Sequence, residues 1–213
     1  KYRNSKIKKS VIMRLSKIIS VILHPIFMPL IALKLTLFLV PSIGDALNTS
    51  ISFIVGIVVI STIILPFISI LFFIKTGAVK SLEMSDHKER STPLMYSAFF
   101  MFIGYLFVNS ALTSASALKA EFLGAIVIIS LAAFISKFWK ISLHMLGIGG
   151  LVGVLIGLHF VSNQDPSQFV LISTLLSGVL GVSRINEKAH NHLQIYIGFI
   201  LGAFIELSSV LVF

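Results

Sequence analysis

The chain has 213 residues, of which 56% are hydrophobic and only 12% are charged, and its mean hydropathy is +1.01. A soluble domain carries about 25% charged residues, so this composition leaves too little polar surface for a water-exposed globule. The absence of cysteine excludes disulfides and thiolate metal sites. Because the apolar residues form long blocks, we predict an all-α, polytopic transmembrane helix bundle.

The net charge of +9 is concentrated at the N-terminus, where seven of the 17 Lys and Arg residues lie in the first 17 positions. In a soluble protein this charge would suggest nucleic acid, but next to an apolar block it is typical of an anchor on anionic lipid. We therefore predict that residues 1–17 are a membrane-proximal tail, with a cytoplasmic N-terminus in a bacterial inner (plasma) membrane and no nucleic-acid partner. The first apolar run lacks a small-residue cleavage site, so no signal peptide is predicted.

Seven apolar blocks approach the length of about 20 residues that a membrane crossing needs. In chain order they cover 18–40, 51–74, 94–112, 121–138, 143–161, 167–182 and 193–213. Pro25 and Pro29 interrupt the first block, so this segment is either a full span or an interfacial helix over about 6–22 followed by a short span. We expect six or seven spans in a single domain over 1–213.

The connections between these blocks are of two kinds. Residues 41–50, 113–120 and 162–168 carry few ionisable groups, whereas 75–93, 137–144 and 183–194 are rich in them. If every intervening block crosses once, two crossings separate each polar loop from the next, and all three lie on one face of the membrane. Fifteen of the 17 basic residues lie in the tail or in these loops, which indicates a composite polar site.

The polar loops contain the groups that a phosphate site needs. Arg90, Arg184 and one or more lysines would bind an anion, because the planar guanidinium donates two parallel hydrogen bonds. Ser142 and the backbone N–H groups of the helix that starts near His144 would add donors. Beside a bound phosphate, His144 and His190 could act as general acid and nucleophile. The simpler alternative is that these basic residues only mark cytoplasmic loops and the histidines lie at the interface.

The third polar loop carries the clearest motif. Ser183-Arg184, five residues, His190, three residues and Gln194 follow the pattern Ser-Arg-x5-His-x3-Asp with one change at the last position. This pattern is the third element of the type 2 phosphatidic acid phosphatase (PAP2) superfamily, which the chain resembles over about 80–198.

The other two elements of that signature, Lys-x6-Arg-Pro and Pro-Ser-Gly-His, are matched in part and in the same order. Ser142 and His144 keep the Ser and His of the second element but not its Pro and Gly. Arg90 stands for the Arg of the first element, with the proline two residues late and Lys80 or Lys88 as the substitute lysine. Three elements in order are a stronger signal than any one of them.

The resemblance implies a PAP2-like helical core and an integral membrane phosphatase for lipid phosphates or diphosphates, such as phosphatidate. His190 would attack phosphorus and form a phosphohistidine, and His144 would protonate the leaving oxygen. No metal or other cofactor would be needed. The phosphoryl oxygens would be held by the remaining motif residues, namely Arg90, Arg184, Ser142, Ser183 and a lysine, Lys88 or Lys80.

Gln194 separates two hypotheses. The Asp of the family orients the nucleophilic histidine and stabilises its positive charge, whereas Gln194 can accept a hydrogen bond but brings no charge. Asp86 or Glu187 would compensate if either lay beside His190. Otherwise the alternative is a catalytically degenerate PAP2-like protein that serves as a binding or structural subunit, with membrane-protein partners.

Three further patterns are interpreted without a cofactor. Glu187-x-x-His190 has the spacing of half a di-iron site, but no second pair exists. A zinc site from His144, His190 and His192 is disfavoured because residues two apart diverge on a helix, so no metal is predicted. The glycines between 147 and 157 look like a nucleotide loop, but in an apolar helix small residues more often allow close helix packing.

Overall fold

The computed structural model describes residues 2–82, 84 and 86–212, and every element in this part of the chain is helical. Seven helical segments are long and apolar enough to cross a membrane, so the protein is a polytopic helical membrane protein. The predicted all-α bundle is confirmed, with seven spans rather than six. The segments are Ser10–Leu39, Pro41–Lys75, His87–Val108, Ser116–Ile135, Leu143–Val161, Ser167–Asn186 and His192–Val212.

The first segment is broken at the predicted prolines. Helix α1 (Tyr2–Ile22) ends before His24, whose Nδ1 accepts the backbone N–H of Ile26 at 3.3 Å and begins the 3-10 turn η1 (Pro25–Phe27). Helix α2 (Met28–Leu39) follows directly. Its 12 residues reach about 18 Å, less than the ~30 Å hydrocarbon core. We therefore infer that α1 and α2 together make this crossing.

The second segment also changes its helical geometry on the way. It consists of α3 (Pro41–Leu47), the 3-10 turn η2 (Asn48–Ser50), α4 (Ile51–Val59), the π-helical turn η3 (Ile60–Ile64) and α5 (Leu65–Lys75). Pro66 near the start of α5 cannot donate a backbone hydrogen bond, which accounts for the wider turn just before it. The Ser61 and Thr62 hydroxyls in this turn donate to the carbonyls of Ile57 and Val58.

The last five spans are single helices. They are α6 (His87–Val108), α7 (Ser116–Ile135), α8 (Leu143–Val161), α9 (Ser167–Asn186) and α10 (His192–Val212), and the 3-10 turn η4 (Ala111–Ser114) joins α6 to α7. Two of these helices extend further into the polar loops than predicted. α6 begins early because Asp86 accepts the Lys88 N–H at 3.0 Å and caps the helix, which puts Arg90 near the helix start instead of in a loop. Arg184 likewise lies in the last turn of α9.

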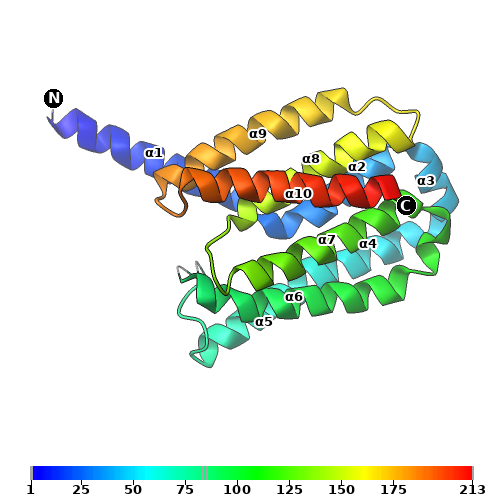
Figure 1. Ribbon diagram of the computed structural model, residues 1–213, viewed down its shortest axis with the longest axis horizontal. Coiled ribbons are helices and arrows are strands. Elements are labelled where there is room, and N and C mark those ends of the chain that lie inside the picture. The colour runs from blue at the N-terminus through cyan, green and yellow to red at the C-terminus, as the bar shows by residue number, and fades with distance from the viewer. Residues whose placement is uncertain (1, 83, 85, 213) are drawn as a thin grey trace.

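Helix α8 is the most buried span and packs most extensively against α10 (Figure 1). Glycines bring the two backbones together: a Cβ on Gly149 would lie 2.3 Å from the Phe199 carbonyl oxygen, and one on Gly153 2.3 Å from that of Ala203. From the other side, a Cβ on Gly202 would meet backbone of α8 at 2.1 Å. The predicted packing role of the α8 glycines is confirmed.

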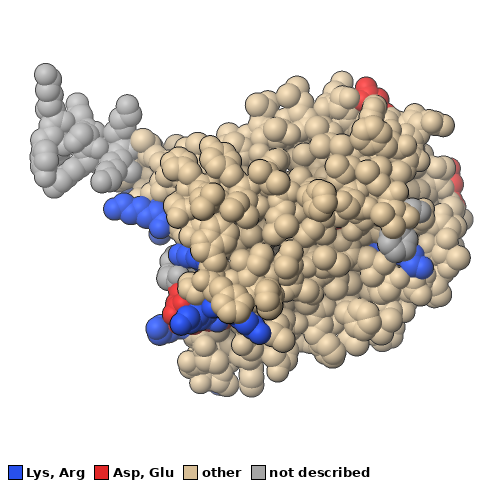
Figure 2. All heavy atoms as spheres, in the orientation of Figure 1, with Lys and Arg blue, Asp and Glu red and all other residues tan. Residues whose placement is uncertain are grey.

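The three polar loops lie at one end of the bundle, the end from which α1 projects, and the C-terminus lies at the other (Figure 1). Lys and Arg side chains gather at this end, as Figure 2 shows. The expectation that the loops share one face is therefore met in the arrangement of the helices. Of the predicted basic tail, Arg14 and Lys17 belong to α1 and are exposed. The side chains of its other members lie outside the described residues: Lys1, Arg3, Lys6, Lys8 and Lys9.

This topology predicts from which side of the membrane single introduced cysteines can be labelled. The chain has no cysteine of its own. Cysteines at the exposed positions Lys80, Lys137 and Lys188 should all react with an impermeant maleimide from one side of sealed vesicles. Cysteines at Asp45 and Asp165 should react only from the other side. Labelling of Lys80 and Lys188 from opposite sides would contradict the seven-span arrangement.

The α8–α10 contact predicts a stability difference between two glycine substitutions. Gly153→Ala should lower the free energy of unfolding by about 1–3 kcal/mol, because its Cβ cannot fit against the α10 backbone. Gly178→Ala in α9 is the matched control. Its Cβ would meet nothing within 4 Å, so the stability should stay the same or rise by up to about 1 kcal/mol. Thermal unfolding in detergent measures both, and equal losses would argue against the close contact.

Candidate functional site

His190 lies in the turn between α9 and α10 and is 8% exposed. Its Nδ1 is 3.0 Å from Oε1 of Gln194, and the backbone N–H of Asn191 donates to the same oxygen at 3.2 Å. An amide oxygen only accepts hydrogen bonds, so Nδ1 carries the hydrogen in the neutral ring and Nε2 keeps its lone pair. The motif residue Gln194 is thus in contact with the histidine that it was predicted to orient.

Gln194 has a second role at the start of α10. Asn191 Oδ1 accepts the Gln194 N–H at 2.9 Å while Gln194 Oε1 accepts the Asn191 N–H, which is a reciprocal capping box. The start of α10 therefore holds the Gln194 amide in place, and with it the orientation and tautomer of the His190 ring.

Arg184 is held by an acidic neighbour and by α1. Its Nη1 donates to Glu187 Oε2 at 2.9 Å, and the other oxygen of Glu187 accepts the Ser20 hydroxyl at 2.7 Å. Glu187, considered above as a replacement acid for His190, thus binds Arg184 and Ser20. Asp86, the other replacement, caps α6. Neither carboxylate has a hydrogen bond to His190 in the described part of the chain.

Helix α1 also contacts the second histidine. His144, half-buried at the start of α8, donates from Nε2 to the backbone carbonyl of Ser20 at 3.0 Å. The His24 ring packs edge-on against the His144 ring, with centroids 5.2 Å apart. Neither Ser20 nor His24 was assigned to the site from the sequence. The available signal was the spacing of Ser16 and Ser20, which puts two hydroxyls on one face of α1.

Three cations from three segments converge on this region. Arg90 near the start of α6 is 6% exposed, and its Nε donates to the Met84 carbonyl at 2.7 Å. The positive charges of Arg90 and Arg184 lie close enough to affect one another, and both affect Lys140. All three are also electrostatic neighbours of His190.

Lys140, and neither of the two lysines that the first motif offered, is the lysine whose charge acts on His190. The side chain of Lys80 is 84% exposed and pairs with Glu89 at 3.3 Å, and Lys88 is exposed at the helix start. Lys140 lies two residues before Ser142, and this proximity to the second motif was the signal that sequence reasoning could have used.

Burial lowers the pKa of His190 to about 4. The hydrogen bond to Gln194 works in the opposite direction, and Arg90, Arg184 and Lys140 lower the pKa further. Burial and the two arginines also lower the pKa of Lys140, partly opposed by Asp86. His190 is therefore a neutral imidazole at physiological pH, surrounded by positive charge.

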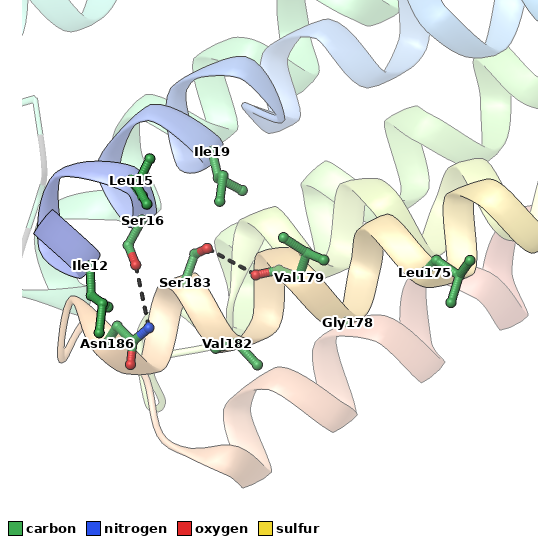
Figure 3. Close-up of a pocket in the computed structure, with 10 residues that line it drawn as sticks. All are labelled: Ile12, Leu15, Ser16, Ile19, Leu175, Gly178, Val179, Val182, Ser183 and Asn186. Carbon is green, nitrogen blue, oxygen red and sulfur yellow. Dashed lines mark hydrogen bonds between the residues drawn. The ribbon is translucent and has the colours of Figure 1, made fainter. Parts of the chain in front are cut away.

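The two predicted serines serve the helices in this structure. Ser142 is fully buried and caps α8, where its Oγ accepts the Met145 N–H at 3.5 Å. Ser183 donates to the Val179 carbonyl at 2.9 Å and faces α1 (Figure 3). The geometry brings Ser183 to the α1–α9 contact and not to the cation cluster.

A groove of about 500 Å³ runs between α1 and α9 (Figure 3). Asn186 Nδ2 donates to Ser16 Oγ at 3.4 Å and closes its polar end, next to the turn that carries Arg184 and Glu187. Ser183 also lines the groove, and the rest of its wall is apolar, formed mainly by Ile12, Leu15, Ile19, Leu175, Val179 and Val182.

Within the described residues, no three His, Asp or Glu side chains are placed to hold a metal ion. His192, a member of the alternative zinc set, is exposed and stacks on Tyr196 with ring centroids 6.4 Å apart. His192 is the first residue of α10 and is exposed, whereas His190, two residues earlier, is buried.

Comparison with protein-family models, with curated proteins and with solved structures finds no match to this chain. The fold and the site define its class: a seven-span helical membrane protein with a cationic, histidine-containing site at one end of the bundle.

The electrostatics of the cluster predict a pKa difference that NMR can measure. The His190 imidazole in the wild-type protein should titrate near pH 4, and Lys140→Gln should raise this pKa by removing one nearby cation. Lys137→Gln is the matched control, because this exposed lysine is not among the electrostatic neighbours of His190. A wild-type pKa near 6.5, or equal shifts in both variants, would contradict the described cluster.

Proposed function

We propose that the protein is an integral membrane phosphatase that hydrolyses lipid phosphates or diphosphates through a phosphohistidine on His190. One observation carries this proposal: Arg90, Arg184 and Lys140 converge on a buried neutral imidazole whose Nδ1 is hydrogen-bonded and whose Nε2 has a lone pair. Converging cations favour an anion with several oxygens, and a neutral imidazole with a fixed tautomer is a suitable nucleophile for phosphorus. The motif resemblance assigns the same histidine and arginines.

The proposed reaction has two steps that balance. His144 takes up a proton when the anionic substrate binds beside it. In the first step, His190 Nε2 forms a bond to phosphorus, the bond to the leaving oxygen breaks, and His144 gives this proton to that oxygen. In the second, water attacks the phosphohistidine, neutral His144 takes the proton, and phosphate leaves with His190 restored. His144 Nε2 is bound to the Ser20 carbonyl, so Nδ1 is the atom that would transfer the proton.

The position of the cluster supports a lipid substrate. Arg90, His144 and Arg184 belong to helices long enough to span the membrane and lie at the ends of those helices, where a lipid headgroup would be. The apolar groove beside α1 offers space for a hydrocarbon chain next to the turn that holds Arg184.

The alternative is a degenerate relative that binds a phosphate group or a membrane partner without turnover. The observation that favours it is the hydrogen bond between His190 and Gln194, because Gln194 brings no charge and its capping box gives it a structural role. Neither of the two acids considered as replacements contacts His190.

We also propose that the site and the N-terminus lie on the cytoplasmic side of a bacterial inner membrane. Lys and Arg gather at the end of the bundle that carries the site (Figure 2), and cytoplasmic loops are enriched in these residues. The C-terminus lies at the opposite end of the bundle. A reporter enzyme that becomes active only outside the cytoplasm should therefore be active when it is fused to the C-terminus.

The phosphatase proposal predicts phosphate release by the purified protein. In lipid nanodiscs that contain phosphatidate, the wild-type protein should release phosphate in the presence of a chelator. His190→Ala and His144→Ala should each abolish release, whereas His192→Ala, which changes an exposed histidine two residues from the nucleophile, should retain it. Release that survives His190→Ala would contradict the proposal.

A charge at position 194 distinguishes the enzyme from the degenerate relative. Gln194→Glu keeps the side-chain length that reaches both His190 and Asn191, and it adds the negative charge that would stabilise a positive imidazole. We expect at least about a tenfold rise in kcat, well below the ~10⁴ that the Asp of a serine-protease triad contributes. If neither the wild type nor Gln194→Glu releases phosphate, the binding-subunit alternative holds.

A further inference from the structure

Two buried carboxyl groups lie in the half of the bundle away from the cation cluster. Glu121, in the second turn of α7, is 7% exposed, and Glu206, near the end of α10, is 4% exposed. Glu206 stands 14 residues beyond His192 on the same helix, or roughly 20 Å along its axis. The proposed phosphatase chemistry does not use either group.

The two carboxyl groups belong to helices that pack together, α7 and α10, and Glu206 Oε2 lies against Gly124, one turn after Glu121. The Glu121 carboxyl group lies close enough to Glu206 for a negative charge on one to disfavour a negative charge on the other. The fully buried Thr36 hydroxyl of α2 donates to Glu121 Oε1. In the described part of the chain, neither carboxyl group has an ion pair, and the buried Oε2 of Glu206 has no hydrogen-bond partner.

The surrounding helices leave room for the Glu206 carboxyl group. A Cβ on Gly124 of α7 would lie 2.3 Å from Glu206 Oε2 and 2.9 Å from Ser209 Oγ. On the other side, a Cβ on Gly150 of α8 would lie 3.2 Å from Glu206 Cγ. Glycine at both positions lets this side chain lie between α7 and α8, where Oε2 has no hydrogen-bond partner among the described residues.

The charged groups on the neighbouring helices do not neutralise this pair. Lys34 on α2 is exposed and Lys119 on α7 is half-buried, and neither pairs with either carboxyl group among the described contacts. Two carboxylates that share an apolar space cannot both be ionised. Ionisable groups inside a membrane protein typically mark ion or proton sites.

We propose that Glu121 and Glu206 form a proton-binding site in the half of the membrane domain opposite the phosphate site. The pair holds an exchangeable proton at neutral pH, and Glu206 Oε2 is the atom free to bind it. Thr36 fixes the Glu121 carboxyl group, and Gly124 and Gly150 provide the space. The inference is independent of the phosphatase activity.

Infrared spectroscopy of the protein in nanodiscs tests the site, because a protonated carboxyl group has its own C=O stretch. At neutral pH the wild-type protein should show this band, which should move when glutamate is labelled with carboxyl-¹³C and disappear as the pH is raised. Glu206→Gln and Glu121→Gln should each weaken the band and shift what remains. Asp165→Asn, which changes an exposed acid, should leave it unchanged.

Three outcomes would overturn the proposal. In the first, the labelled wild-type protein lacks the band at neutral pH; this outcome does not depend on any variant folding. The band is present but neither glutamine substitution alters it. The band is lost in sodium chloride but kept in choline chloride, which would make sodium the bound cation in place of the proton.

Discussion

The close contact between the backbones of α8 and α10 is the constraint on which the site depends. His144 begins one of these helices, and His190 stands just before the other. The glycines that face each other across this contact leave no space for even one methyl group. The contact therefore fixes the separation of the two histidines more firmly than any polar interaction at the membrane surface could, because such interactions compete with water.

Helix α1, which lies outside the α8–α10 pair, contributes further contacts to the site. The Ser20 hydroxyl bonds to Glu187, which holds Arg184, and the Ser20 carbonyl accepts from His144. One residue thus joins Arg184 and His144, the proposed phosphate-binding and proton-transfer groups, which belong to different helices. Bringing Arg90, Arg184 and Lys140 together costs electrostatic free energy, and a bound phosphate would offset this cost more fully than the carboxylate of Glu187 alone.

The class of fold could be predicted from the sequence, and so could the grouping of Arg90, Arg184, His190 and Gln194 in one region. Long apolar blocks predicted the spans, and counting crossings put the three polar loops at one end. The start of α6 was missed although Asp86-x-x-Glu89 is a readable capping signal. The contacts of Ser20 could not be predicted, because they join residues more than 120 positions apart. Sequence spacing alone also does not reveal that Lys140 lies near His190 while Lys80 is exposed to solvent, because this depends on how the helices pack.

A structure of the protein with orthovanadate tests the central claim most directly, because vanadate resembles phosphorus in the transition state of phosphoryl transfer. The account predicts vanadate bonded to His190 Nε2 and contacted by Arg90, Arg184 and Lys140, with Nδ1 still bound to residue 194. Vanadate absent from this cluster, at concentrations that saturate histidine phosphatases, would contradict both the proposed enzyme and a phosphate-binding subunit.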